Sequence, residues 1–308
     1  MAGSINLTVK IGNLIFKNPI LTASGTFGYG LEYSKYLNLS KLGGIITKGL
    51  SLYEKLGNPP PRIVETPCGM LNAIGLQNIG IDAFIVEKLP KLSRFNTHII
   101  ANIYGAEVED FVRIAEKIEN EDRISAIEIN VSCPNVSAGG ALFGKDPDMV
   151  FVLVSSVKKV TKKPIIVKLT PNVSDIAFIA QAAQSAGADA VSLINTITGM
   201  VIDTKTKKHL LANKTGGLSG PAIYPVGVRM VYEVYEKVKI PIIGVGGIYN
   251  ADIALQYIMA GATLVEIGTA NFIDPSITME ILKGIEEYME NEGIKNISQL
   301  IGIAHSSK

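Results

Sequence analysis

The segment KKPIIVKLT, residues 162–170, returns further along the chain as KIPIIGVGG, residues 239–247. A second pair, SAGADAV at 185–191 and MAGATLV at 259–265, follows the first at a similar spacing. Each copy joins a short apolar, β-branched run to a helical pattern and then to another apolar run. This order is typical of a strand–helix–strand unit whose two strands are parallel.

Short apolar runs of this kind recur eight times, each bounded by glycine, proline or polar residues. Most are apolar throughout, which indicates parallel strands buried on both faces. They cover residues 19–25, 43–49, 98–105, 126–133, 164–170, 189–196, 241–247 and 262–269. Strands and helices in this alternation predict an α/β fold, a (β/α)8 TIM barrel, and the alternative is an open doubly wound sheet.

Segments outside the strands complete this prediction. The runs INLTVKI and LIFKN around Gly12-Asn13 predict an N-terminal hairpin that closes the bottom of the barrel. Two insertions, residues 50–80 and 197–225, follow predicted strands, so both should lie over the C-terminal face, where barrel enzymes keep their chemistry. Helix starts are predicted at Asp146, Ser174, Asn250 and Ser276. We expect residues 1–308 to form a single barrel domain.

The composition narrows the class of protein. Apolar residues make up 47% and charged residues 19%, so a large core is expected and disorder is not. A net charge of +1 argues against nucleic acid or an anionic membrane as the main partner. The only cysteines, Cys68 and Cys133, are too few for a disulfide framework or a metal cluster, and Cys68 is interpreted as a small buried side chain. No signal peptide or membrane span is apparent, so a cytoplasmic location is expected.

Polar residues stand at the C-terminal ends of the predicted strands, which converge on one face of a barrel. They are Ser24, Thr47, Lys48, Asn102, Asn130, Cys133, Lys168, Asn195 and Thr196. Lys48 and Lys168 lie in otherwise apolar runs, and burying an ammonium group without an anionic partner is costly, so an anion is expected near them. The alternatives are solvated lysines and asparagines that only cap loops.

The last two predicted strands end in GVGG, residues 244–247, and EIGT, residues 266–269. Their backbone N–H groups can bind a phosphate, a frequent arrangement after strands 7 and 8 of a barrel. The alternative is that these glycines only form tight turns. The GVGG segment lacks the G-x-G-x-x-G spacing of a nicotinamide-binding loop.

Cys133 lies in NVSCPN, residues 130–135, where a proline ends the strand and the thiol should enter the loop above the barrel. A thiol, with a pKa of about 8.5, can act as a general base or as a nucleophile. The histidines His98, His209 and His305 have no obvious placement beside it, which favours a base. The alternative is a small buried side chain.

Several segments together resemble the catalytic subunit of B-type class 1 dihydroorotate dehydrogenases, in family order and over nearly the whole chain. They include ASGTFGYG (23–30), NAIGLQN (72–78), NVSCPN (130–135), VKLTPNV (167–173), GGLSGPAI (216–223) and GVGGI (244–248). The resemblance implies an FMN-dependent oxidoreductase that converts dihydroorotate to orotate in de novo pyrimidine biosynthesis. A cysteine base and the absence of N-terminal anchor helices distinguish it from the membrane-bound class 2.

The resemblance also implies roles for individual residues. Cys133 would take the proton from carbon C5 of dihydroorotate, while a hydride passes from C6 to the flavin. The substrate would contact Lys48, Asn72, Ala73, Ile74, Gly75, Leu76, Asn130, Asn135, Asn195 and Thr196. FMN, one per chain, would contact Ser24, Thr47, Lys48, Asn102, Asn130, Lys168, Gly220, Gly246, Gly247, Gly268 and Thr269. No metal site is implied in this chain.

A B-type protein would also have a partner. The resemblance implies a homodimer associated with a subunit that carries FAD and a 2Fe–2S cluster, in a heterotetramer that passes electrons to NAD. Three alternatives stay open: another FMN-dependent barrel oxidising a related dihydropyrimidine, a phosphate-binding isomerase or lyase, and a noncatalytic scaffold subunit.

Overall fold

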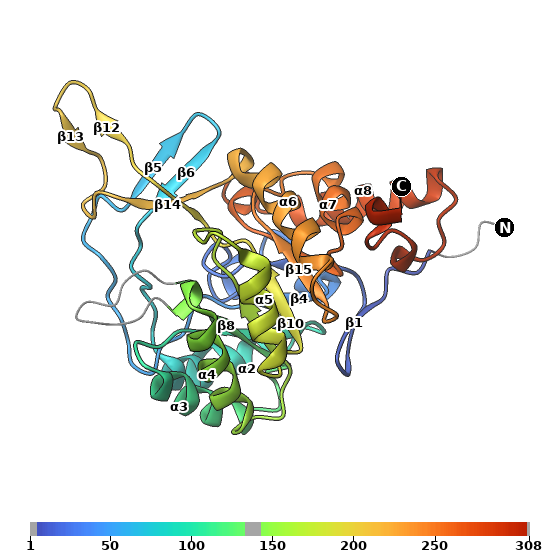
Figure 1. The fold of residues 1–308 in the computed structure, drawn as a ribbon, viewed down its shortest axis with the longest axis horizontal. Coiled ribbons are helices and arrows are strands. Elements are labelled where there is room, and N and C mark those ends of the chain that lie inside the picture. Colours follow the sequence, from blue (N-terminus) through green and yellow to red (C-terminus); the bar gives the residue numbers. More distant parts are fainter. Residues whose placement is uncertain (1–4, 133–142, 307–308) are drawn as a thin grey trace.

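A closed barrel of eight parallel strands forms the centre of the computed structural model, which describes residues 5–132 and 143–306 (Figure 1). Going round the barrel, the strands are β3 (Ile20–Thr22), β4 (Gly44–Ile46), β7 (His98–Ile103), β8 (Ala126–Asn130), β9 (Ile165–Lys168), β10 (Ala190–Leu193), β15 (Ile242–Val245) and β16 (Leu264–Ile267). Each predicted apolar run contains one of them, so the predicted (β/α)8 barrel is confirmed and the open sheet is wrong.

Helices surround the barrel because each has one apolar face to bury. The long ones in the described residues are α3 (Val108–Glu119), α4 (Pro147–Lys158), α5 (Ile176–Ser185), α6 (Tyr224–Tyr235), α7 (Ala251–Met259) and α8 (Ile277–Asn291). A continuous helical segment of α1 (Ile81–Ala83), the π-helix η3 (Phe84–Lys88) and α2 (Leu89–Leu92) precedes β7. In the parts of the chain that the structure describes, no helix is long and apolar enough to cross a membrane.

Most of the predicted helix starts are confirmed. The side chain of Asp146 accepts a hydrogen bond from the backbone N–H of Asp148, and Asn250 caps α7 in the same way. The prediction of Ser174 is wrong, because the carboxylate of Asp175, one residue later, accepts the bond from Phe178 N–H at 3.0 Å. A carboxylate also interacts favourably with the helix dipole at this end, which a serine hydroxyl does not.

The predicted N-terminal hairpin is formed by β1 (Val9–Ile11) and β2 (Leu14–Phe16). The fully buried ring of Phe16 lies 4.6 Å from the ring of His98, and His98 Nε2 is 2.9 Å from the carbonyl oxygen of Ile15. Because His98 begins β7, the hairpin closes the N-terminal end of the barrel, as predicted, and leaves the other end to the insertions.

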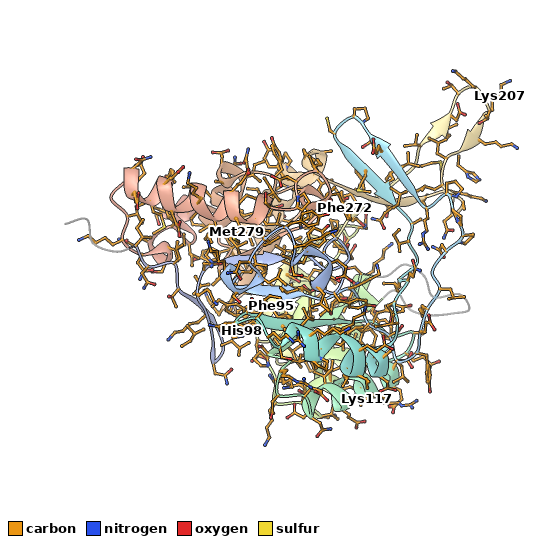
Figure 2. The ribbon with its side chains drawn as sticks, turned by 180° about the vertical axis from the view of Figure 1, so that it is seen from behind. Phe95, His98, Lys117, Lys207, Phe272 and Met279 are labelled. Carbon is orange, nitrogen blue, oxygen red and sulfur yellow. The ribbon has the colours of Figure 1, made fainter. Side chains whose placement is uncertain are left out.

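The two insertions join into one antiparallel sheet at the opposite end. Its strand order is β11 (Ile197–Gly199), β14 (Gly216–Ser219), β6 (Gly69–Asn72) and β5 (Ile63–Thr66). Figure 1 shows this sheet standing away from the helices beside a second hairpin, β12 (Ile202–Asp203) and β13 (Lys208–His209), whose tip carries Lys207 in Figure 2. The predicted placement over the C-terminal face is confirmed.

Cys68 departs from its predicted environment. It is exposed rather than buried, because it lies in the tight turn between β5 and β6, beyond the barrel core. Its backbone carbonyl accepts a hydrogen bond from Ala222 N–H at 2.9 Å, which fastens this turn to the segment before α6. The contact is made by the backbone, so it does not require a cysteine here.

Candidate active site

Lys48 follows β4 at the mouth of the barrel, where none of the described residues gives it an anionic partner. Its backbone N–H donates to the carbonyl of Gly28, which fixes the chain where the side chain departs. Within the described residues, its ammonium group makes no ion pair or hydrogen bond. Burial, and then the positive charge of Arg62, lower the pKa of Lys48. The predicted anion is therefore not supplied by the described protein atoms.

Asn102, near the end of β7, lies in the same region. The residue is fully buried, and its backbone N–H donates to Thr47 Oγ1 at 3.2 Å. Its Nδ2 donates to Glu128, whereas its Oδ1 has no hydrogen-bond partner among the described residues. A Cβ on Gly49 would lie 2.9 Å from that oxygen, so Gly49 keeps the space beside it open. An unsatisfied buried amide oxygen is suited to a ligand N–H or O–H group.

The ends of β8 and β9 are tied to each other. The side chain of Asn130 accepts a hydrogen bond from Ser132 N–H at 3.1 Å, and Ser132 Oγ donates to the carbonyl of Lys168 at 3.0 Å. This fixes the chain up to the residue before Cys133. Cys133 and Asn135 themselves lie outside the described residues, so their predicted roles stay predictions.

Lys168 has its anions inside the barrel. Its Nζ lies 2.6 Å from Glu266 Oε2 and 3.6 Å from Glu128 Oε1, and all three side chains are almost fully buried. Burial alone would lower the pKa of Lys168, but the neighbouring carboxyl groups of Glu128 and Glu266 raise it above its ordinary value, so the group stays protonated. The expected anion is thus part of the protein. Both glutamates were missed, although each interrupts an apolar run, AIEI and LVEI.

The insertion sheet brings together two predicted substrate segments that are far apart in the sequence. Gly217 pairs with Asn72 on one side and with Thr198 on the other. Asn72 Nδ2 donates to Gly217 O at 3.5 Å, and a Cβ on Gly217 would lie 2.0 Å from Thr196 Oγ1. Asn72 and Thr196 therefore both adjoin this glycine strand, and Thr196 N–H donates to the side chain of Asn195.

The loop of Ala73, Ile74, Gly75 and Leu76 folds back on the chain that precedes β5. Ala73 N–H donates to Arg62 O, and Asn58 N–H donates to Ile74 O at 2.9 Å. Gly75 has a φ of +73°, and a Cβ there would lie 2.5 Å from the Asn58 side chain, so glycine is required.

Asn78, a buried residue that sequence reasoning missed, holds the ends of this loop. Its Oδ1 accepts hydrogen bonds from Ser51 N–H at 3.1 Å and Gly80 N–H at 2.8 Å. Its Nδ2 donates to Ser51 Oγ and to Leu76 O. The available signal was its place as the last letter of NAIGLQN, where the loop returns to the barrel.

The predicted phosphate-binding glycines converge on one place. A Cβ on Gly247, whose φ is +69°, would lie 2.7 Å from Gly220 O, and Thr269 Oγ1 donates to Ser219 Oγ at 2.8 Å. No hydrogen bond from the backbone N–H of Gly246, Gly247 or Gly268 is found within the described residues. These segments therefore offer a narrow cradle with free donors.

Tyr257 of α7, another residue that sequence reasoning missed, supports this cradle. Its hydroxyl donates to Gly246 O at 2.7 Å, and its ring packs so closely that a Cβ on Gly244 would lie 2.5 Å from it. Burial raises the pKa of the Tyr257 hydroxyl, so it remains a neutral donor.

The structure brings most of the predicted residues to one end of the barrel. Ser24 lies in the half-buried turn after β3, and the neighbouring Ala23 would be 3.5 Å from a Cβ on Gly268. The histidines lie elsewhere: His98 is at the opposite end, and His209 is in the outer hairpin. In residues 5–132 and 143–306, no group of three or more potential ligands is arranged to hold a metal ion.

Comparisons with known proteins agree with this geometry. The family model described as dihydroorotate dehydrogenase matches residues 6–289. A protein of Geotalea uraniireducens named dihydroorotate dehydrogenase B (NAD(+)), catalytic subunit, is 55% identical over 300 residues, which are 97% of this chain and 98% of that protein. A protein of Thermodesulfovibrio yellowstonii with the same name is 55% identical over 96% of this chain and 98% of its own.

A solved structure has the same fold. The crystal structure of DHODH from Eimeria tenella in complex with ferulenol covers 97% of this chain and 89% of its own, with a TM-score of 0.80 and 22% identity. At that identity the likeness concerns the fold alone. The family model and the near full-length relatives carry the assignment: this chain belongs to the dihydroorotate dehydrogenase family.

Proposed function

We propose that this chain oxidises dihydroorotate to orotate in de novo pyrimidine biosynthesis, with FMN as its cofactor. The observation that carries the proposal is the half-buried Lys48 ammonium, which has no anionic partner within the described residues and lies at the mouth of the barrel. Dihydroorotate has a carboxylate, and FMN has a phosphate and an imide-like ring, so either ligand supplies what this end of the barrel lacks. The names of the relatives point to the same reaction.

The residues present fit FMN. The cradle at Gly220, Gly246, Gly247, Gly268 and Thr269 has N–H donors that no described residue occupies and that a phosphate needs. Asn102 Oδ1 and the Lys48 ammonium have no partner among the described residues, and each suits an edge of a flavin ring or a substrate. We propose that Ser24, Thr47, Asn130 and Lys168 complete the cofactor site. When bound, FMN supplies the hydride acceptor for the reaction.

The protein's own part in the chemistry is to orient the substrate and to move one proton. We propose that the Cys133 thiolate takes the proton from C5 while the C6 hydride departs, so that the C5–C6 double bond of orotate forms and the electrons balance. Charge that develops on the carbonyl next to C5 needs donors, and the amides of Asn72, Asn130, Asn135 and Asn195 can provide them. Thr196 and the loop from Ala73 to Leu76 would enclose the ring.

The electrons must then leave the chain. We propose that residues 1–308 form one FMN-binding domain that pairs as a homodimer with a second subunit carrying FAD and a 2Fe–2S cluster, in the cytoplasm. The support is that the relatives are named as NAD(+)-type catalytic subunits. In addition, the GVGG segment of this chain lacks the nicotinamide fingerprint, and two cysteines are too few for a cluster.

The reaction is tested by mixing the FMN-loaded protein with dihydroorotate without oxygen. We expect the flavin absorbance to bleach, with one orotate formed per flavin, and dihydrouracil to react at least tenfold more slowly. Faster bleaching by dihydrouracil would favour the alternative, a barrel that oxidises a related dihydropyrimidine. A protein that binds no FMN would overturn the proposal.

The same assay tests Cys133. A serine hydroxyl is a much poorer base near neutral pH, so Cys133→Ser should slow flavin reduction about 100-fold or more while FMN stays bound. Cys68→Ser, at the exposed turn between β5 and β6, is the matched control and should leave the rate unchanged. An unchanged rate in Cys133→Ser would remove Cys133 from the proton transfer.

A further inference from the structure

Below the mouth, the barrel interior contains a layer of polar side chains made of Asn102, Glu128, Lys168, Ser192 and Glu266. They come from β7, β8, β9, β10 and β16, and none is more than 5% exposed. Two carboxyl groups and one ammonium group are enclosed here, and no further charged side chain among the described residues pairs with them. If both carboxyl groups were ionised, the layer would bury one uncompensated negative charge, which is costly at this depth.

The two glutamates differ in how well their oxygens are satisfied. Glu128 Oε1 accepts a hydrogen bond from Ser192 Oγ at 2.7 Å, and its Oε2 accepts from Asn102 Nδ2. Glu266 has only one partner, because Oε2 accepts from Lys168 Nζ while the fully buried Oε1 has none among the described residues. A buried carboxylate with a bare oxygen is much less stable than a neutral acid in the same place.

We propose that Glu128 and Glu266 hold one proton between them, resting on Glu266, so that the layer is neutral and Lys168 is fixed below the barrel mouth. Glu266 then acts as a positioning residue for Lys168 and not as its counter-ion. Burial and the negative charge of Glu128 raise the pKa of Glu266 well above its ordinary value, which agrees with this arrangement. The short Lys168–Glu266 contact is compatible with it, since the carbonyl oxygen of a neutral acid also accepts from an ammonium group.

The charge of this layer affects how easily a bound flavin is reduced, an expectation that rests on the proposed function. The ammonium of Lys168 carries a positive charge that one carboxylate already balances. Removing either glutamate alone lets the other one supply the balancing charge. Removing both leaves the positive charge of Lys168 uncompensated, which would favour the more negative, reduced form of a flavin bound above.

Infrared spectroscopy of the protein without FMN tests the shared proton. We expect the difference spectrum between the wild-type protein and Glu266→Gln at neutral pH to contain the C=O stretch of a protonated carboxylic acid. No such band would overturn the proposal. Because FMN is absent from this measurement, its outcome does not depend on the proposed function.

A redox titration of the FMN-loaded protein tests the charge balance. Glu128→Gln and Glu266→Gln should each shift the equilibrium between oxidised and reduced FMN by less than threefold. The double variant should shift it at least tenfold toward reduced flavin, about 30 mV for a two-electron couple. Single variants that each shift it tenfold, with additive effects in the double variant, would mean that both glutamates are ionised and would overturn the proposal. If the double variant does not fold, the single variants still decide.

Discussion

The interior layer holds a buried lysine and the mouth of the barrel a half-buried one, and the two charges are balanced in opposite ways. In the layer, Lys168 lies between two glutamates, at 2.6 and 3.6 Å. At the mouth, Lys48 meets no carboxylate within the described residues, and the like charge of Arg62 adds to burial in lowering its pKa. A buried charge that a carboxylate of the protein balances indicates a fixed framework, whereas a charge without such a partner indicates a place where a ligand binds.

The same contrast holds for the neutral polar groups. In the layer, Ser192 and the Asn102 amide nitrogen are bonded to Glu128. Toward the mouth, the Asn102 amide oxygen and the N–H groups of Gly246 and Gly247 have no partner among the described residues. The Asn102 side chain therefore belongs to both regions: its nitrogen is bonded within the layer, and its oxygen is available to a ligand.

Removing the framework lysine should have the largest effect on stability. Lys168→Met leaves a buried carboxylate without its cation, so we expect the free energy of unfolding to fall by about 3–5 kcal/mol. Urea or guanidinium unfolding of the protein without FMN measures it. Lys162→Met, an exposed lysine just before the same strand, is the control and should change the free energy by less than about 0.5 kcal/mol. A loss below about 1 kcal/mol for Lys168→Met would show that the layer is not the framework described.

Removing the amide that organises the substrate loop should have a smaller effect. Asn78→Ala deletes hydrogen bonds to Ser51, Leu76 and Gly80. We expect a loss of about 1–3 kcal/mol and faster hydrogen exchange in residues 72–80. Asn78→Asp keeps the two bonds that Oδ1 accepts and should exchange at an intermediate rate. Unchanged exchange in Asn78→Ala would mean that the loop is held by its backbone bonds alone.

The barrel strands and the helix starts were largely predictable from the sequence, because local patterns indicate them. The barrel strands are short apolar runs bounded by turn residues, and the caps at Asp146 and Asn250 signal helix starts directly. Ser174 and Asp175 are adjacent residues that can both cap a helix, and only the backbone geometry decides between them.

Long-range pairing limited what could be predicted of the site. The contact between Asn72 and Gly217 joins residues 145 positions apart, so no local pattern reveals the insertion sheet or the exposed turn that carries Cys68. The partners of Lys168 depend on which side chains point into the closed barrel, and that follows from strand register. The sequence could predict that Lys168 needs an anion nearby, but not that Glu128 and Glu266 provide it.

The most direct test of the contrast is the affinity of FMN-loaded Lys48→Met for orotate, measured by titration of the flavin spectrum. A charge-assisted hydrogen bond contributes about 1.5–3 kcal/mol, so we expect Kd to rise about 10- to 150-fold, with an unchanged free energy of unfolding within about 1 kcal/mol. Lys41→Met, at an exposed position before β4, is the control.

The pH dependence of orotate affinity is a second test of the role of Lys48. Because the pKa of Lys48 is lowered, its ammonium group loses its proton at a lower pH than an ordinary lysine. Orotate affinity of the wild-type protein should therefore fall as the pH rises through that lowered pKa, while the affinity of Lys48→Met stays flat over the same range. Equal affinities of the two proteins at neutral pH would contradict the account, because Lys48 would then not be the group that binds the anion.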